Sequence, residues 1–496
     1  MDRSHAEWIA QAAELKIEGR AFIDGAYVEA ADARRFDCID PARGVKLTEV
    51  SHCAPDDVDR AVAAARRAFD SGAWSGLSPR ARGDILKRFA ALIRDNADEL
   101  ALLETLDMGK PIADSTSVDI PGAAYCVQWF AEAIDKTGGE LAPVDPALLG
   151  LVSREPIGVV AAVVPWNFPL LMASWKFGPA LAAGNAVIVK PSEKSPLSAI
   201  RVAALAHEAG VPAGIFQVLP GAGDVGQALA RHAGVDCIAF TGSTAVGKRI
   251  AACAAETNLK RVWLELGGKS PNIVLADCPD IAAAARSAAA AIFFNMGEMC
   301  TAGSRVLVHN AIRERFIAAL LDAARRWQPG DPLDPASAMG AIVDRLQFDR
   351  VLGHIEGGRA SGAELLCGGS AARKDSGGLF IEPTVFACPR PDLPLCREEI
   401  FGPVLALIGF DDVEEAIAIA NDSEYGLAAA VWTADLSTAH RVSRRLRAGT
   451  VWVNCYDEGG DMNLPFGGFK QSGNGRDKSL HALDKYTELK TTLIKL

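Results

Sequence analysis

Residues 158–190 read GVVAAVVPWNFPLLMASWKFGPALAAGNAVIVK, with apolar β-type runs at Val159–Val164 and Ala186–Val189 and a helical stretch between them. Two further runs, Ile215–Leu219 and Cys237–Phe240, continue the alternation. Continuous apolar strands separated by helices are typical of a parallel sheet covered on both faces. The pattern predicts an α/β fold with a nucleotide site at the strand ends.

A second set of apolar runs follows in the C-terminal half, again with helical stretches between them: Asn272–Leu275, Arg305–Val308, Val404–Ile408, Ala428–Trp432 and Val451–Val453. These runs predict a second α/β domain that begins near Leu266. Near the N-terminus, residues 18–30 alternate apolar and polar side chains around Asp24-Gly25, which indicates a β-hairpin.

Length and charge restrict the class of protein. A chain of 496 residues is expected to form two or three domains. Its net charge of −11 argues against nucleic acid as a partner. The eleven cysteines form no CxxC pair, and no His cluster has metal-ligand spacing, so we expect reduced thiols and no metal. No signal peptide or membrane-spanning run is found, which predicts a cytoplasmic protein without a membrane partner.

Two glycine motifs imitate nucleotide fingerprints. Residues 221–226, GAGDVG, match GxGxxG, but the expected acid about 20 residues on is missing, since Asp236 comes only ten residues after Gly226. We interpret this motif as an ordinary strand-to-helix turn. Residues 242–249, GSTAVGKR, nearly match a P-loop, yet Arg249 replaces the hydroxyl that would hold Mg²⁺, which disfavours a kinase. Its backbone N–H groups either face a phosphate or form a plain helix cap.

One thiol and one carboxylate suggest covalent catalysis. Cys300 lies in FFNMGEMCTAGSR (residues 293–305), and Glu265 lies in the glycine-rich LELGGKSP (residues 264–271). A thiolate is a strong nucleophile and a good leaving group, and a nearby carboxylate can act as a base.

The chain resembles the aldehyde dehydrogenase superfamily over nearly its whole length. The resemblance rests on motifs that agree in order: PWNFP (165–169), KPSE (190–193), FTGST (240–244), ELGGK (265–269), the Cys300 segment, EEIFGP (398–403) and PFGGFK (465–470). The stretch 469–483 is similar to a narrower group, the bacterial enzymes of polyamine breakdown that act on γ-glutamyl-γ-aminobutyraldehyde, guanidinobutyraldehyde and related ω-aminoaldehydes.

The resemblance implies a Rossmann-like parallel-sheet NAD-binding domain (1–137 and 158–265) and an α/β catalytic domain (266–477). It also implies a small β oligomerisation element (138–157 and 478–496), which would build a homodimer or homotetramer.

The resemblance also implies roles for the catalytic residues. Cys300 would attack the aldehyde, Asn167 would stabilise the oxyanion, and Glu265 would activate the water that hydrolyses the thioester. Lys176 and Asp477 would complete a proton relay, although Asp477 stands where many relatives carry the longer Glu. Met296 and Glu298 occupy positions where many relatives carry Gln. Glu298 also occurs in the polyamine-linked group, whereas Met296 is expected to alter the packing behind the nucleophile, in a direction that the sequence leaves open.

For the cofactor the resemblance implies NAD, with NADP left open, because a carboxylate on the ribose repels a 2′-phosphate while Lys190 attracts one. The expected contacts are Val164, Trp166, Lys190, Ser192, Glu193, Gly223, Thr241, Gly242, Ser243, Gly247, Leu266, Glu399 and Phe401. The expected substrate tunnel consists of Phe168, Trp175, Trp129, Met299, Asp457 and Phe466. The acidic loop 457–461 either attracts the cationic end of the substrate or is a solvated polar loop.

We therefore expect an NAD(P)-dependent oxidoreductase that converts a small cationic aldehyde to its acid. The alternatives are a general aliphatic or betaine-type aldehyde dehydrogenase, a CoA-acylating enzyme, and a catalytically silent scaffold. Glu265 counts against CoA as the resolving nucleophile, and the joint presence of Cys300, Glu265 and Asn167 counts against a silent scaffold.

Overall fold

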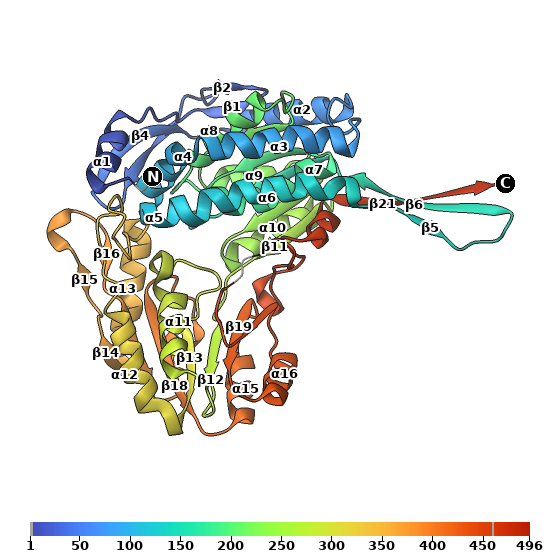
Figure 1. Cartoon of the computed structure of the whole chain (residues 1–496). Helices are drawn as coiled ribbons and strands as arrows, with labels where there is room; N and C mark the ends of the chain where they lie inside the picture. Colours follow the sequence, from blue (N-terminus) through green and yellow to red (C-terminus); the bar gives the residue numbers. More distant parts are fainter. Residues whose placement is uncertain (1–2, 459–460) are drawn as a thin grey trace.

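A computed structural model describes residues 3–458 and 461–496, which form two α/β bodies and a projecting arm (Figure 1). The first body is built on a seven-stranded sheet with the order β11-β10-β7-β8-β9-β1-β2. Its parallel strands are β7 (Val159–Val163), β8 (Ala186–Lys190), β9 (Phe216–Val218), β10 (Cys237–Thr241) and β11 (Arg261–Glu265). The hairpin β1 (Ala21–Ile23) and β2 (Ala26–Val28) adds the antiparallel edge.

Two groups of helices cover this sheet because its central strands are buried on both faces. The first group packs α2 (Pro55–Asp70) against β7 and β8, with α9 (Gly223–Arg231) and α10 (Thr244–Glu256) beside it. The second group packs α7 (Pro169–Ala183) against the same two strands. Beside α7, α8 (Leu197–Glu208) packs against β9 and β1, and behind these two helices lie α3 (Pro79–Asp95), α4 (Ala97–Met108) and α6 (Ile120–Ala133).

The second body is built on another seven-stranded sheet, with the order β14-β17-β18-β13-β12-β19-β20. Six of its strands are parallel: β12 (Pro271–Val274), β13 (Arg305–His309), β17 (Thr384–Cys388), β18 (Val404–Phe410), β19 (Ala428–Trp432) and β20 (Thr450–Val453). The antiparallel β14 (Glu364–Cys367) forms one edge. Its main helices are α11 (Ile281–Phe293), α12 (Arg313–Ala324), α13 (Arg345–Ala360), α15 (Val413–Asn421) and α16 (Leu436–Arg445).

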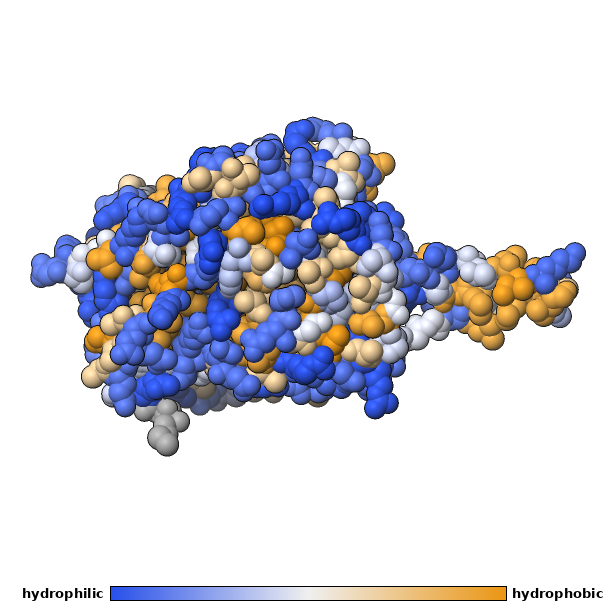
Figure 2. Space-filling view, turned by 90° about the horizontal axis from the view of Figure 1, so that it is seen from above, coloured by the Kyte–Doolittle hydropathy of each residue, from blue (hydrophilic) through white to orange (hydrophobic). Residues whose placement is uncertain are grey.

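The arm is a three-stranded antiparallel sheet of β5 (Glu140–Ala142), β6 (Leu148–Pro156) and β21 (Thr487–Lys495). It projects away from both bodies (Figure 1). Apolar side chains on the arm are exposed, including Leu141 at 71%, Leu489 at 61% and Leu493 at 57% of their surface. Figure 2 shows that apolar surface gathers along the arm.

The predicted α/β class is confirmed, and every predicted apolar run coincides with a strand of one of the two sheets. The pattern did not predict two strands of the second sheet, the edge strand β14 and the fully buried β17. It also did not predict β11, whose Arg261 and half-buried Val262 and Trp263 make a mixed rather than an apolar run, or the hairpin of β3 (Arg35–Asp40) and β4 (Val45–Ser51). The first sheet ends at Glu265 and the second begins at Pro271, while the domain boundaries stay predictions. Within the described residues, no helix is both long and apolar enough to cross a membrane.

Candidate active site

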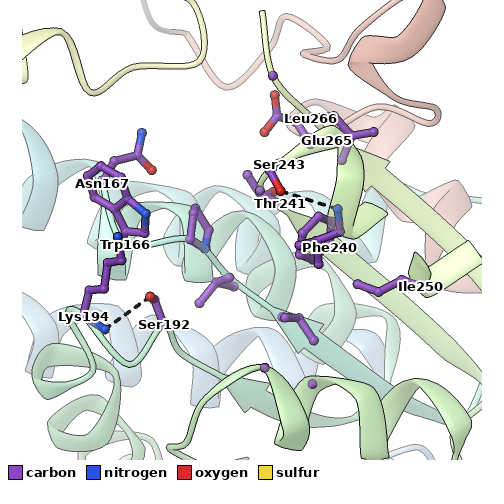
Figure 3. A pocket seen from close by; sticks show the side chains of 18 of the residues that line it. Trp166, Asn167, Ser192, Lys194, Phe240, Thr241, Ser243, Ile250, Glu265 and Leu266 are labelled. Atoms are coloured by element: carbon purple, nitrogen blue, oxygen red, sulfur yellow. Dashed lines mark hydrogen bonds between the residues drawn. The ribbon is translucent and has the colours of Figure 1, made fainter. Parts of the chain in front are cut away.

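A cleft of about 700 Å³ opens between the two bodies. Its lining joins the carboxyl ends of the first sheet's strands to residues of the second body, so it lies at the edge where parallel sheets bind ligands. Both Glu265 and Cys300 line it. Figure 3 shows Trp166 and Asn167 on one side of this pocket and Thr241, Glu265 and Leu266 on the opposite side.

The volume and the helix ends of this cleft fit a dinucleotide. Ligand pockets typically measure roughly 300–1,000 Å³, and the N-termini of α9 and α10 both open on the cleft through Gly223 and Ser243. The first N–H groups of a helix have no partner in the helix and attract phosphate. Ser243 caps α10 by accepting a hydrogen bond from the Val246 N–H at 3.4 Å.

A lysine and a glutamate mark the other end of the cleft. Lys190 Nζ lies 3.3 Å from Glu193 Oε2, and the Glu193 side chain is 43% exposed to the cleft and solvent. Burial lowers the pKa of Lys190, and Glu193 opposes that shift. This pair therefore offers both a carboxylate for ribose hydroxyls and a cation.

Twelve of the thirteen predicted cofactor residues line the cleft: Val164, Trp166, Lys190, Ser192, Glu193, Gly223, Thr241, Gly242, Ser243, Leu266, Glu399 and Phe401. Gly247 does not. It lies beneath Leu266, where a Cβ atom would stand 2.6 Å from Leu266 Cδ2, so it serves close packing behind the cleft wall.

The turn before the nucleophile has an unusual backbone. Asn295, Met296 and Gly297 have φ angles of 48°, 56° and 72°, in the left-handed region that non-glycine residues rarely occupy. Such conformations cost about 1–3 kcal/mol each and persist where the surroundings enforce them. They end α11 and turn the chain so that Cys300 lines the cleft.

The surroundings of Cys300 favour the protonated thiol. Burial is the main cause that raises its pKa well above the ordinary value, and the carboxylates of Glu265, Asp457 and Glu399 raise it further. The other described elements supply no cation that offsets them in this shift. Cys300 therefore needs a base to remove its proton.

The amide of Asn167 reaches the same turn. Asn167 follows β7, and its Nδ2 donates to the carbonyl oxygen of Glu298 at 2.8 Å. Asn295 Nδ2 donates to that oxygen at 3.2 Å and to the Asn167 carbonyl at 3.1 Å. The predicted oxyanion donor and the nucleophile turn are thus held together.

Glu265 ends β11 and is buried with both carboxylate oxygens free of partners among the described residues. Burial raises its pKa to about 8, Asp477 and Glu399 raise it too, and Lys176 lowers it. A carboxyl with this pKa can accept a proton near neutral pH and release it again.

A buried lysine-rich cluster, defined as Lys176, Asp477 and Lys485, stands behind Glu265. Asp477 accepts from Lys176 through Oδ2 and from Lys485 through Oδ1. These three residues and Glu265 line a cavity of about 10 Å³, enough for one water molecule. Lys176 and Asp477 thus lie beside Glu265, as predicted for a relay, and Lys485 was not predicted.

Glycine allows the carboxylate of Glu399 to approach the chain closely. Glu399 Oε1 accepts from the Gly268 N–H at 2.9 Å, and a Cβ atom on Gly267 would stand 2.3 Å from Glu399 Oε2. Any side chain at Gly267 would therefore displace Glu399 from the cleft wall.

Sequence reasoning missed several polar residues of the cleft, among them two on α13 of the second body and Lys194 on the first body. Gln347 Nε2 donates to the carbonyls of Ile400 at 3.0 Å and Phe401 at 2.6 Å, and Arg350 Nη2 donates to the Glu399 carbonyl at 2.8 Å. Lys194 also lines the cleft. The i, i+3 spacing of Gln347 and Arg350 on α13 was the available signal, because it places both on one face.

The predicted substrate residues do not line this cleft; they form aromatic pairs nearby. Phe168 stacks on Phe294 with ring centroids 6.4 Å apart, and Trp175 meets Phe466 edge-on at 5.3 Å. Phe466 pairs with Asp477 through backbone hydrogen bonds in both directions. Trp129 Nε1 donates to Asn463 Oδ1 at 3.2 Å, and Met299 is buried.

The described acidic loop has three exposed acidic residues, which differ in their partners. Asp457 accepts from Thr301 Oγ1 at 3.1 Å, beside the nucleophile. Desolvation of its carboxyl raises the pKa of Asp457, and Lys478 opposes that shift. Glu458 and Asp461 are exposed, and Asp461 accepts from Asn463. Residues 459 and 460 of the predicted loop lie outside the described residues.

Comparisons with known proteins agree on one family. The model of the aldehyde dehydrogenase family matches residues 27–492. The chain is 54% identical to the NADP/NAD-dependent aldehyde dehydrogenase PuuC of Escherichia coli, over 99% of this chain and 98% of that protein. It is 68% identical to the crystal structure of γ-glutamyl-γ-aminobutyraldehyde dehydrogenase from Burkholderia cenocepacia (TM-score 0.99) and 59% identical to P. syringae AldA indole-3-acetaldehyde dehydrogenase in complex with NAD⁺ (TM-score 0.99), each over 100% of both chains.

Proposed function

Because the chain belongs to the aldehyde dehydrogenase family, we propose that it oxidises an ω-amino-, γ-glutamylamino- or guanidino-butyraldehyde to the carboxylic acid through Cys300. The chain is an NAD(P)-dependent oxidoreductase acting on the aldehyde group. The observation that carries the mechanism is that Cys300 and Glu265 face one cleft, with the Asn167 amide on the nucleophile turn.

In the first step the sulfur of Cys300 adds to the aldehyde carbon and the thiol proton leaves. The carbonyl electron pair moves onto oxygen, which gives a thiohemiacetal. Asn167 Nδ2 keeps one N–H beyond its bond to Glu298, and this N–H stabilises the oxygen charge. Glu265 is the carboxyl facing the same cleft that has a suitable pKa to take the thiol proton.

The bound nicotinamide dinucleotide supplies the acceptor for the hydride that leaves the former aldehyde carbon. These residues of the cleft lining would orient it: Glu193 and Lys190 would hold the adenosine ribose, the start of α10 the pyrophosphate, and Glu399 and Phe401 the nicotinamide ribose. Loss of the hydride leaves a thioester on Cys300.

Water then resolves the thioester. Glu265 first passes on the proton that it took from the Cys300 thiol and so becomes a base again. It then removes a proton from water, the water oxygen adds to the acyl carbon, and the C–S bond breaks to release the acid and the thiolate. Lys176 and Asp477 receive the proton from Glu265 across the cavity that they share. A free carboxylate at this place favours water over CoA as the resolving nucleophile.

The substrate class rests on relatives and on surface charge. The B. cenocepacia enzyme is named for γ-glutamyl-γ-aminobutyraldehyde, and a relative from Pseudomonas aeruginosa, 48% identical, is named for aminoacetaldehyde. The described acidic loop exposes Glu458 and Asp461. We assign the attraction of a cationic aldehyde to these two residues, because Asp457 is already bonded to Thr301.

Two measurements test this function. The covalent step is tested by mixing the enzyme with an aldehyde: we expect a burst of NADH that C300A loses, and E265Q should keep the burst while losing steady turnover.

For the substrate, kcat/KM is compared among 4-aminobutyraldehyde, its γ-glutamyl and guanidino forms, betaine aldehyde, indole-3-acetaldehyde and hexanal, with NAD and NADP. A clear preference for hexanal or indole-3-acetaldehyde contradicts the cationic class, as does an unchanged preference in D461N.

We further propose that a second copy of this chain covers the apolar side of the arm, giving a homodimer or homotetramer. The exposed leucines of β5 and β21 are the reason, since a soluble monomer rarely exposes so much apolar surface in one place. Light scattering of the wild type and of L489K/L493K tests it, and a wild-type monomer contradicts it. The cytoplasmic location stays a prediction.

A further inference from the structure

Glu298 is a buried carboxyl that the mechanism above does not use. It lies two residues before Cys300 and exposes none of its surface. A titratable group this deeply buried beside the nucleophile calls for an explanation.

Glu298 connects three parts of the site. Its side-chain Oε1 accepts from the Val343 N–H at 3.3 Å. Its backbone carbonyl accepts from Asn167 Nδ2 at 2.8 Å and from Asn295 Nδ2 at 3.2 Å. The side chain thus fixes the position of the carbonyl that orients the Asn167 amide.

The segment that receives Glu298 is itself fixed to the cofactor side of the cleft. The neighbouring Gly340 N–H lies 3.1 Å from Met296 Sδ, which makes a second connection to the nucleophile turn. Asp344 follows Val343, caps α13 through the Gln347 N–H at 2.8 Å, and bonds Lys194 Nζ at 2.8 Å. The connection at Glu298 therefore joins the nucleophile turn to the helix that carries Gln347.

Burial favours the neutral form of Glu298; of the charges around it, the two lysines oppose that form and only Asp344 supports it. Lys194, Lys110 and Asp344 are the charged groups that face it. Lys194 is already paired with Asp344, and Lys110 with Asp119 at 2.6 Å. Glu298 Oε2 has no hydrogen-bond partner among the described residues. Burial raises the pKa of Glu298 well above its ordinary value.

We propose that Glu298 is a positioning residue that works as a neutral acid: its carboxyl fastens the nucleophile turn to Val343 and so sets the Asn167 amide beside Cys300. The proposal rests on the proposed function. Ionisation would place an uncompensated negative charge beside Asp344 and loosen the turn, so catalysis would fall on the alkaline side.

Glu298→Gln and Glu298→Leu separate the possible roles, because Gln keeps a neutral acceptor of the same shape and Leu keeps only the volume. We expect E298Q to retain kcat within about twofold at pH 7.5, and E298L to lose at least about tenfold with little change in the Kd for NAD. Across pH 6–10, the alkaline fall of the wild type should be smaller in E298Q, a change that a purely structural role would not produce.

A tenfold loss in E298Q would show that the ionised carboxylate is needed and would overturn the proposal. If E298L had the kcat of the wild type, the positioning role would be contradicted. If wild type and E298Q had identical activity profiles at alkaline pH, the proposed effect of Glu298 ionisation would be contradicted. D57N is the matched control, because Asp57 is a buried carboxyl at the start of α2, where it accepts from the Ala31 and Ala54 N–H groups.

A second readout keeps this test independent of the substrate. The rate at which iodoacetamide alkylates Cys300 is followed by mass spectrometry of its peptide, over the same pH range and in the same variants. If no aldehyde gives NADH, the proposed function is contradicted. If the rate of alkylation depends on pH in the same way in wild type and E298Q, the Glu298 proposal alone is contradicted.

Discussion

Two buried clusters of charge lie against helix α7, and their charges are balanced in opposite ways. The lysine-rich cluster holds two lysines around Asp477. The second, which we call the acid-rich cluster, holds four carboxyls around Lys110: Glu104, Asp107, Asp114 and Asp119. Glu104 accepts from the Leu170 N–H at 2.7 Å and so caps α7, whereas Lys176 lies within that helix.

Burial alone therefore does not decide protonation in this molecule. In the acid-rich cluster, burial and neighbouring carboxylates raise the pKa of Glu104 and Asp114 to about 7. In the lysine-rich cluster, burial also opposes the charge of Asp477, yet its pKa is lowered because Lys176 and Lys485 are adjacent. The lysine-rich cluster keeps an ionised carboxylate next to Glu265, whereas the acid-rich cluster holds carboxyls that stay protonated to a higher pH than usual.

The largest effect is expected for Asp477→Asn. It leaves two buried lysines without a counter-charge, and such uncompensated charge costs about 3–5 kcal/mol. The urea-unfolding free energy should fall by that amount, and steady-state turnover should fall more than the NADH burst, because the relay acts after hydride transfer. K485M is the control: it leaves the Lys176–Asp477 pair and should cost less. A D477N protein as stable as the wild type would contradict the charge argument.

Lys110→Met should have the next largest effect, and it should depend on pH. Asp119 loses the partner at 2.6 Å, and the excess of acid grows. We expect a loss of about 3 kcal/mol at pH 8, and less at pH 5, because the carboxyls can then take up protons. Urea unfolding at both pH values measures the difference. An equal loss at both pH values would mean that the cluster does not titrate.

Glu104→Gln tests the acid-rich cluster by removing one of its titratable carboxyls instead of its lysine. The folded-state pKa of Glu104 is raised from 4.5 to about 7, so the folded protein binds more protons than the unfolded chain in this window. Its contribution is therefore full below pH 4.5 and is lost as the pH rises to about 7, by about 1.4 kcal/mol per pH unit. E104Q keeps both accepted hydrogen bonds and should flatten the stability curve between pH 5 and 7. E49Q, an exposed carboxyl on β4, should leave it unchanged.

Asp484→Asn is expected to have the smallest effect. Asp484 Oδ1 bonds Arg154 Nη1 at 2.6 Å at the root of the arm, but both side chains are substantially exposed. Exposed pairs contribute about 0–1 kcal/mol because water screens them. Urea unfolding should therefore change by less than 1 kcal/mol. A loss comparable to that of D477N would show that this pair is buried in the assembled protein.

The fold was largely predictable because buried parallel strands carry a local signal. The run Ala428–Trp432 coincides with β19, since both faces of that strand are covered and every residue is apolar. β11 escaped prediction because it is an edge strand with Arg261 exposed and its middle half-buried. Edge strands lose the apolar pattern and with it the signal.

The site residues that stand in sequence motifs could be predicted, whereas those that join the site only through long-range contacts could not. Cys300, Glu265 and Asn167 stand in recognisable segments, and the structure brings all three to one cleft. Lys485 lies eight positions beyond Asp477 in an ordinary-looking tail, and only folding shows that it shares the carboxylate. Gln347 likewise becomes visible only when α13 is placed against Phe401.

The C-terminal stretch has a consequence for how this catalyst responds to dilution. Lys485 is followed after one residue by β21, so the amine that bonds Asp477 and the arm belong to one continuous stretch, and Trp263 Nε1 holds the Lys485 carbonyl at 2.9 Å. Release of the arm from a neighbouring copy would therefore shift Lys485 and weaken its bond to Asp477. Specific activity should then depend on protein concentration, with thioester hydrolysis slowing before hydride transfer does.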